Sequence, residues 1–181
     1  MGVKITRDKV AEVLASVKTL TRQQVLVGIP GENAERKDTT RSPIDNVALG
    51  FIHELGSPIN NIPARPFLVP GVRDALPALL PKLKRAGQQA LDFKGVPAIV
   101  EQLIAVGLAA ASAVQMKITT GPFEPIKDAT KRARLTRKAG YRNASDARKL
   151  KMMAKWMAGD FKPLIDTGSL RSSISFAIRP K

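Results

Sequence analysis

The chain has 181 residues, of which 44% are hydrophobic and 4% aromatic, with 30 Lys and Arg, 15 Asp and Glu, one His and no Cys. This length suits one ordinary domain with a buried core, and the lack of cysteine excludes disulfide scaffolds, thiolate metal sites and cysteine nucleophiles. The formal net charge of +15 indicates a polyanionic partner or an acidic protein surface.

The first third of the chain predicts a helix, a strand and a loop. Apolar residues recur at helical spacing over residues 5–20, which predicts an amphipathic helix. Over residues 23–29 they alternate, which predicts a strand that stops at Pro30-Gly31. Residues 32–43 are polar without periodicity, so we expect an exposed, mobile loop.

A short helix is predicted next, with Asp45 as its N-cap and Gly56 as its C-cap. Residues 57–69 are rich in proline and are expected to be irregular. The leucines of residues 76–83 have helical spacing, but two prolines lie among them. A proline inside a helix removes a backbone donor, so this helix either starts near the first proline or is kinked.

The second half adds the long helix and the last strand. Residues 102–116 carry no charge and are too few for the ~20 apolar residues of a bilayer span, so we predict a buried helix and no membrane contact. A short helix is predicted over 145–157, and alternation predicts a strand over 174–178. The whole chain, 1–181, is therefore predicted to be a single α+β domain, with a small antiparallel or mixed sheet packed against several helices and a long central helix.

The positive charge is concentrated in one stretch. Residues 127–155 hold eleven Lys and Arg against two Asp, more than half of the net charge. Within it, residues 127–142 lack apolar periodicity and are expected to form a basic arm that orders on a partner. The cations expected to make contacts are Lys131, Arg132, Arg134, Arg137, Lys138 and Arg142.

Two partners fit such an arm. Clustered cations gain affinity for nucleic acid through counterion release, so a nucleic-acid-binding module using residues 127–155 is one hypothesis. Only Tyr141 and Trp156 are available there for base stacking, and the surrounding chain has no pattern of a nucleic-acid-binding fold. An acidic protein surface is therefore the favoured partner.

Two short motifs of the chain are similar to parts of catalytic sites. His53-Glu54 is similar to the start of the HExxH zinc motif, but Ser57 occupies the position of the second His. Asp166-Thr167-Gly168 matches the tripeptide of aspartic proteases, which leaves a dimeric protease as a hypothesis, although a cationic segment follows where a shielded dyad is needed. The favoured interpretation is a turn. No catalytic, metal-binding or cofactor-binding residue is predicted, and no cofactor or enzymatic activity is expected.

Two regions together resemble a known family. These are VLVGIPGE (25–32) followed by NVALGFIHELGSPINNIPARPFLVPGV (46–72), and PLIDTGSLRSSISFAI (163–178). Their order and spacing resemble the tail-completion or virion-morphogenesis proteins of tailed bacteriophages, a family of minor tail and head–tail joining proteins. The basic stretch lies outside the resemblance.

The resemblance implies a structural virion protein of the tail or neck, assembled in the cytoplasm of the bacterial host. It implies a homo-oligomeric ring, with a hexamer favoured, that joins the tail tube or terminator to the head connector, with DNA as a passing contact. Cyclic assembly needs heterologous interfaces. Terminator, completion and adaptor roles stay open. The motif residues are expected to act structurally: Arg65, Pro66 and Phe67 as an anchor, and Asp166, Thr167 and Gly168 as the turn that sets the last strand.

Overall fold

A computed structural model describes residues 9–35, 44–92, 94–159 and 161–181. The α+β class is confirmed, because the described residues are mostly helical and a two-stranded antiparallel sheet packs against the helices. The elements in chain order are α1 (Val10–Arg22), β1 (Gln23–Gly28), the 3-10 turn η1 (Gly31–Asn33), α2 (Asn46–Leu55), the 3-10 turn η2 (Pro58–Asn60), α3 (Leu68–Leu91), α4 (Gly95–Thr120), α5 (Asp128–Thr136), α6 (Ala139–Arg142), α7 (Asp146–Met157), α8 (Ser169–Ser173) and β2 (Ser175–Pro180).

The sheet joins segments from the two ends of the chain. Val25 of β1 lies opposite Ile178 of β2, and Val27 lies opposite Phe176. The predicted alternation directs apolar side chains of both strands onto α4. A Cβ atom added at Gly107 of α4 would lie 2.1 Å from Phe176 Cδ2, so this close approach of helix and sheet requires glycine.

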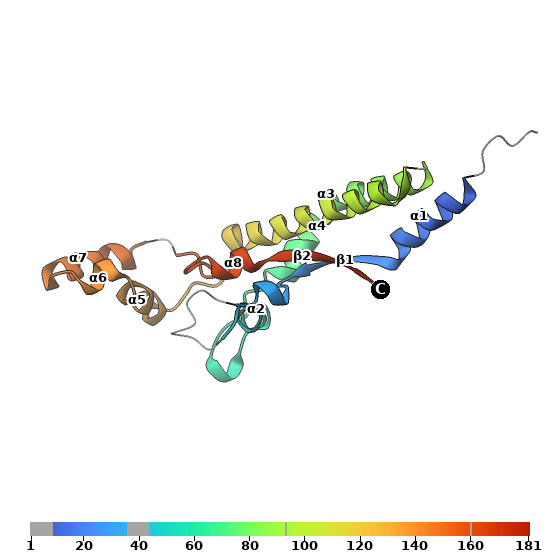
Figure 1. The fold of residues 1–181 in the computed structure, drawn as a ribbon. Coiled ribbons are helices and arrows are strands. Elements are labelled where there is room, and N and C mark those ends of the chain that lie inside the picture. The colour runs from blue at the N-terminus through green and yellow to red at the C-terminus, as the bar shows by residue number, and fades with distance from the viewer. Residues whose placement is uncertain (1–8, 36–43, 93, 160) are drawn as a thin grey trace, which may run out of the picture.

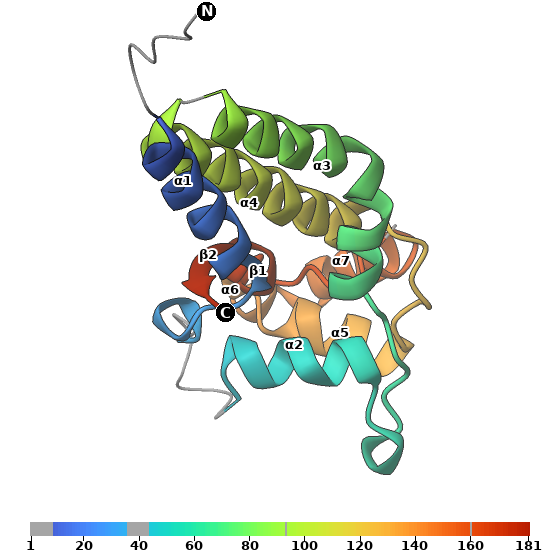
Figure 2. The ribbon, with the colours of Figure 1, turned by 90° about the vertical axis from the view of Figure 1, so that its right-hand side faces the viewer.

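The long helices α3 and α4 pack along each other, and α1 lies against both near the turn that connects them (Figure 1, Figure 2). The predicted buried helix is part of α4, whose buried residues are Ile99, Leu103, Val106, Gly107, Ala110, Ala111, Val114 and Ile118. Among the described helices, α4 alone is long and apolar enough to cross a membrane by length and composition. In this fold, α3 and the sheet cover one of its faces.

Helix α3 begins at Leu68 and continues through Pro77 and Pro81, so the alternative of a start near Pro77 is wrong. Both prolines are exposed, and water can therefore bond to the carbonyls that lose their helical partners. On the other side, residues such as Leu79 and Ala86 are buried. Packing of this buried face offsets the cost of the two prolines.

The expected loop over 32–43 is only partly described. Its first residues are not irregular, because η1 includes Asn33 and the Asn46 N–H donates to Ala34 O at 2.8 Å. The Asn46 side chain is 2% exposed and its Nδ2 lies 3.3 Å from the carbonyls of both Asn33 and Glu35. These bonds fix 33–35 to the start of α2. The remainder of the predicted mobile loop, 36–43, lies outside the described residues.

The predicted basic arm over 127–142 is wrong as an extended segment, because α5 and α6 form there. Together with α7 they make a group of helices at one end of the molecule, here called the basic module (residues 128–157; Figure 1). Leu135 of α5 is 1% exposed, and Trp156 of α7 donates through Nε1 to Lys131 O at 2.9 Å. Helix α5 packs against α7, and the Trp156 ring contacts Phe161, so α5 is held by residues that are distant in the sequence.

Candidate functional site

The end of α2, the chain that follows it and the start of α3, residues 53–69, form a connection here called the bracket. Gly56 ends α2 with φ of 79°, as predicted, and a Cβ there would lie 2.8 Å from Ala64 N. Ser57 and Ile62 pair as an isolated antiparallel bridge, so the chain makes a small hairpin that projects from the body (Figure 2). The chain then returns to α2, where the Arg65 N–H donates to His53 O at 2.6 Å.

Glu54 caps the start of α3 from the preceding helix. Its Oε2 accepts hydrogen bonds from the N–H groups of Phe67 at 2.7 Å and Leu68 at 2.8 Å, and its Oε1 accepts from Val69 at 3.0 Å. The first N–H groups of a helix lack partners within it, and a negative charge is favoured there. Glu54 therefore supplies the cap that the chain next to α3 lacks.

Arg65 ties the bracket to the segment that leads into the basic module. The side chain is buried, with 6% exposed, and Nε donates to Glu124 O at 2.8 Å while Nη2 donates to Pro125 O at 3.2 Å. Its partners are therefore sixty residues away rather than across the local turn. Pro66 is exposed, and Phe67, 2% exposed, belongs to the main apolar core.

His53 is enclosed beside these cations. Desolvation by burial, together with the charges of Arg65 and Arg134, lowers the pKa of His53 to about 4. Its Nδ1 is buried and has no hydrogen-bond partner among the residues that the structure describes. The imidazole is therefore neutral near pH 7 and packs as an uncharged side chain. Among the described residues, no group of three or more His, Asp or Glu is placed to hold a metal ion.

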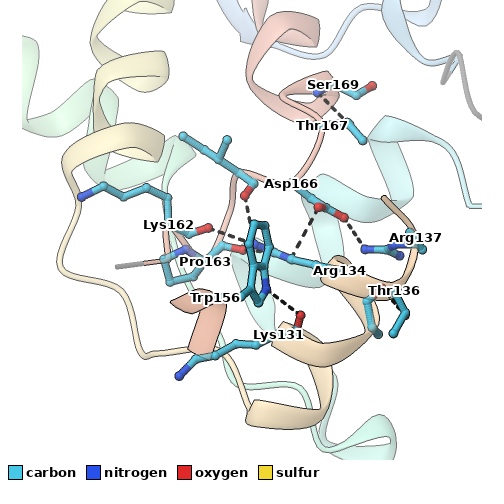
Figure 3. Close-up of polar contacts among 12 residues, drawn as sticks. Lys131, Arg134, Thr136, Arg137, Trp156, Lys162, Pro163, Asp166, Thr167 and Ser169 are labelled. Carbon is cyan, nitrogen blue, oxygen red and sulfur yellow. Dashed lines mark hydrogen bonds and ion pairs between the residues drawn. The ribbon is translucent and has the colours of Figure 1, made fainter. Parts of the chain in front are cut away.

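Arg134 holds the basic module against the chain that leads to α8. Its guanidinium donates hydrogen bonds to three backbone carbonyls of the loop before α8: Lys162 O at 3.2 Å, Pro163 O at 2.8 Å and Ile165 O at 2.9 Å (Figure 3). Asp166 Oδ1 lies 3.8 Å from Arg134 Nε. Burial lowers the pKa of Arg134 from its ordinary value, and the charge of Asp166 opposes that shift.

Most of the predicted contact cations are used inside the molecule. Arg137 forms an ion pair with Asp166 (Figure 3), and Lys138 Nζ lies 4.0 Å from the centre of the Trp156 ring. Lys131 pairs with Asp128 at 3.1 Å. Arg132 and Arg142 are the other two predicted contact residues. Both are exposed, and the described interactions include no internal contact of this kind for either.

The chain bends at Asp166-Thr167-Gly168. Gly168 adopts φ of 83°, the left-handed conformation expected of it, and leads into the short helix α8, which directly precedes β2. Asp166 accepts from an arginine side chain rather than from nearby N–H groups. Thr167 Oγ1 accepts from the Ser169 N–H at 3.3 Å, which helps to start α8.

An apolar groove next to the bracket was not foreseen from the sequence. Val47, Phe51 and Leu55 form a stripe along α2 and are 43%, 66% and 61% exposed. They border a hollow of about 340 Å³, here called the α2 groove, whose other lining residues are Ile29, Gly50, Glu54, Phe67, Leu68 and Ile174. The helical spacing of the stripe is visible in the sequence, but the sequence does not show that the stripe is exposed.

The polar contacts of the bracket and the basic module share one role. The side chains of Glu54, Arg65 and Arg134 each bind backbone groups of distant segments. They hold segments in place, and the exposed surface is left to apolar stripes and to the remaining cations. No family model, no curated protein and no solved structure matches the chain.

Proposed function

We propose that the chain is a structural protein of a tailed-bacteriophage virion, a tail-completion or neck component that joins the tail to the head connector. The proposal combines the resemblance over residues 25–72 and 163–178 with the surface of the folded chain. Such a protein acts through surface complementarity in a ring of copies and in contact with neighbouring proteins.

One observation carries this proposal: the chain exposes more surface than a compact monomer needs to. A compact protein of this mass exposes about 8,500 Å², whereas this chain exposes 12301 Å². Even if the 18 residues outside the described ranges contribute about 2,900 Å², about 9,400 Å² is left for the others. A compact protein made of those other residues alone exposes about 7,900 Å², so the excess is about 1,500 Å². Two standard interfaces bury about 1,600 Å² of one protomer, so the excess is of the size that two neighbours in a ring would cover.

The excess surface is apolar in several places. The most exposed large apolar side chain among the described residues is Ile59, at 98%, at the tip of the hairpin, and Leu150 of α7 is 75% exposed. Single exposed apolar residues are common on monomers, whereas contiguous stripes mark contact sites. The stripe of α2 is contiguous with the α2 groove, which supports a role in assembly.

Joining activity tests this proposal. Heads and tails are to be purified from a phage lysate that lacks this chain, and the purified protein is added back. We expect the protein to bind tail tubes, or connectors, in co-sedimentation and to restore joined particles in electron micrographs. A protein that binds neither tubes nor connectors, and restores no particles, contradicts the proposal.

A nucleic-acid-binding module is the second candidate, favoured by the concentration of charge in residues 127–155. Four of the cations expected to reach phosphate instead make internal contacts, which supports the first proposal. A titration of duplex DNA at several salt concentrations separates the two. Binding at physiological salt, with a steep fall of affinity as salt rises, favours the second candidate.

A further inference from the structure

The charge of the chain is divided between two surfaces. Residues 23–64 hold five carboxylates against three Lys and Arg, in a chain with a net charge of +15. Residues 127–155 hold eleven Lys and Arg against two Asp. The first region includes α2 and the second forms the basic module, and Figure 1 shows α2 and α7 apart from each other. In the described part of 23–64 the charged side chains are those of Glu32, Glu35, Asp45 and Glu54, so the described surface has an acidic region near α2 and a basic region on the basic module.

The acidic surface includes the α2 groove. Phe51 is the most exposed residue of its stripe, at 66%. Exposed carboxylates stand near the start of α2, those of Glu32, Glu35 and Asp45. The bonds from Asn46 to the carbonyls of residues 33 and 35 hold this backbone against α2. Glu32 and Glu35 line a neighbouring hollow that also includes Arg171, so the apolar groove of α2 lies beside a predominantly acidic region.

The outer face of α7 has the complementary character. Leu150 is 75% exposed, and Ala147 and Ala154 lie one turn from it on the same exposed edge. The adjoining edge carries the exposed cations Arg148, Lys151 and Lys155. The inner face is occupied, because Trp156 bonds to α5. Helix α7 therefore presents an apolar edge beside a basic edge.

We propose that the outer face of α7 in one copy of the chain docks into the α2 groove of a second copy. Leu150 enters the apolar hollow beside Phe51, and the basic edge of α7 meets the carboxylates at the start of α2. Amphipathic helices commonly bind apolar grooves in this way. The contact joins two different surfaces, so it is heterologous and repeats from copy to copy into a ring or a filament. This inference rests on the proposed role in assembly and specifies its self-contact.

Charge complementarity favours this pair of surfaces over the exposed leucines of α3. The exposed leucines of α3, such as Leu80 at 57%, stand among exposed cations of the same helix, Arg73, Lys82, Lys84 and Arg85. A basic helix is repelled there, whereas opposite charges around the α2 groove favour its approach. The α2 groove is therefore the acceptor that suits α7.

Analytical ultracentrifugation of two complementary variants tests the contact. At about 100 µM, where a contact of micromolar Kd is filled, we expect the wild-type chain to sediment as species larger than a dimer. Phe51→Glu and Leu150→Glu are each expected to be monomeric. A 1:1 mixture of the two is expected to form dimers only, because one intact groove meets one intact α7. Leu80→Glu is the matched control and is expected to associate like the wild type.

The expected salt dependence is a second measurement. Raising salt from about 50 mM to about 0.5 M screens the charge contacts and is expected to weaken association at least tenfold. The proposal is overturned if the wild type stays monomeric, if the mixture stays monomeric while the wild type associates, or if both glutamate variants associate normally. Melting temperatures close to that of the wild type show that the variants fold. Binding of the wild type to tail tubes without self-association overturns this contact and leaves the proposed function standing.

Discussion

Replacing Glu54 is expected to destabilise the fold more than the loss of an ordinary surface carboxylate. In Glu54→Ala, the N–H groups of Phe67, Leu68 and Val69 lose the acceptors that lie 2.7–3.0 Å away. Each buried donor left without a partner costs about 1–3 kcal/mol, but Val69 is 56% exposed and water can replace its bond. We therefore expect a loss of about 2–4 kcal/mol in the free energy of unfolding.

Thermal unfolding followed by circular dichroism measures this effect. For a chain of this length, 1 kcal/mol corresponds to about 2–4 °C in Tm, so Glu54→Ala is expected to lower Tm by about 4–16 °C. Glu54→Gln keeps one acceptor oxygen and is expected to lose about half as much. Glu101→Gln, an exposed glutamate of α4, is the control and should stay within about 2 °C. If the Tm of Glu54→Ala lies within about 2 °C of the wild-type Tm, like that of the control, the carboxylate does not cap α3.

Three further predictions concern the core, the histidine and the basic module. Gly107→Ala places a methyl group against the Phe176 ring and is expected to lower the unfolding free energy by about 1–3 kcal/mol in urea titrations. The pKa of His53 falls from 6.5 to about 4 in the fold, so the unfolded chain takes up the proton first as pH falls. The contribution of neutral His53 to stability is therefore fully present above pH 6.5 and is lost as the pH falls to 4. The free energy of unfolding is expected to fall by about 2 kcal/mol between pH 7 and pH 5, and His53→Gln should remove this part of the pH dependence. Asp166→Asn removes the charge that pairs with Arg137 and faces Arg134, and is expected to cost about 1–2 kcal/mol and to speed tryptic cleavage in α5 and α6.

Each of these predictions has a result that contradicts it. Gly107→Ala with wild-type stability would mean that α4 and β2 are not in close contact. Parallel pH profiles for wild type and His53→Gln would mean that the imidazole is not desolvated. An unchanged rate of tryptic cleavage in Asp166→Asn would mean that the ion pairs do not hold the basic module. Arg132→Gln, at an exposed cation, is the control for the last of these.

The parts of the fold that follow a local pattern could be predicted from the sequence. The alternation of apolar residues predicted both strands correctly, because one face of the sheet packs on α4. The Asp45 cap, whose Oδ1 accepts from the Ala48 N–H at 2.7 Å, has the standard spacing of an N-cap. Gly56 was predicted by the same reasoning. In each case the residues that interact are a few positions apart.

The parts that depend on distant contacts could not be predicted. The helix α5 has few apolar residues, and its stability comes from Trp156 and from the carbonyls that Arg134 binds, about thirty residues further along the chain. Glu54 caps a helix that starts fourteen residues later, so no capping-box spacing announces it. Nothing in the sequence indicated that the apolar stripe of α2 would be exposed, since a stripe of this kind is usually buried.

Addition of the purified chain to separated heads and tails is the measurement that tests the proposed function most directly. We expect the chain to bind tail tubes or connectors, and the number of joined, infectious particles to rise with its concentration. The outcome that would contradict it is a chain that binds neither component and instead binds duplex DNA at physiological salt, with an affinity that falls steeply as salt is raised.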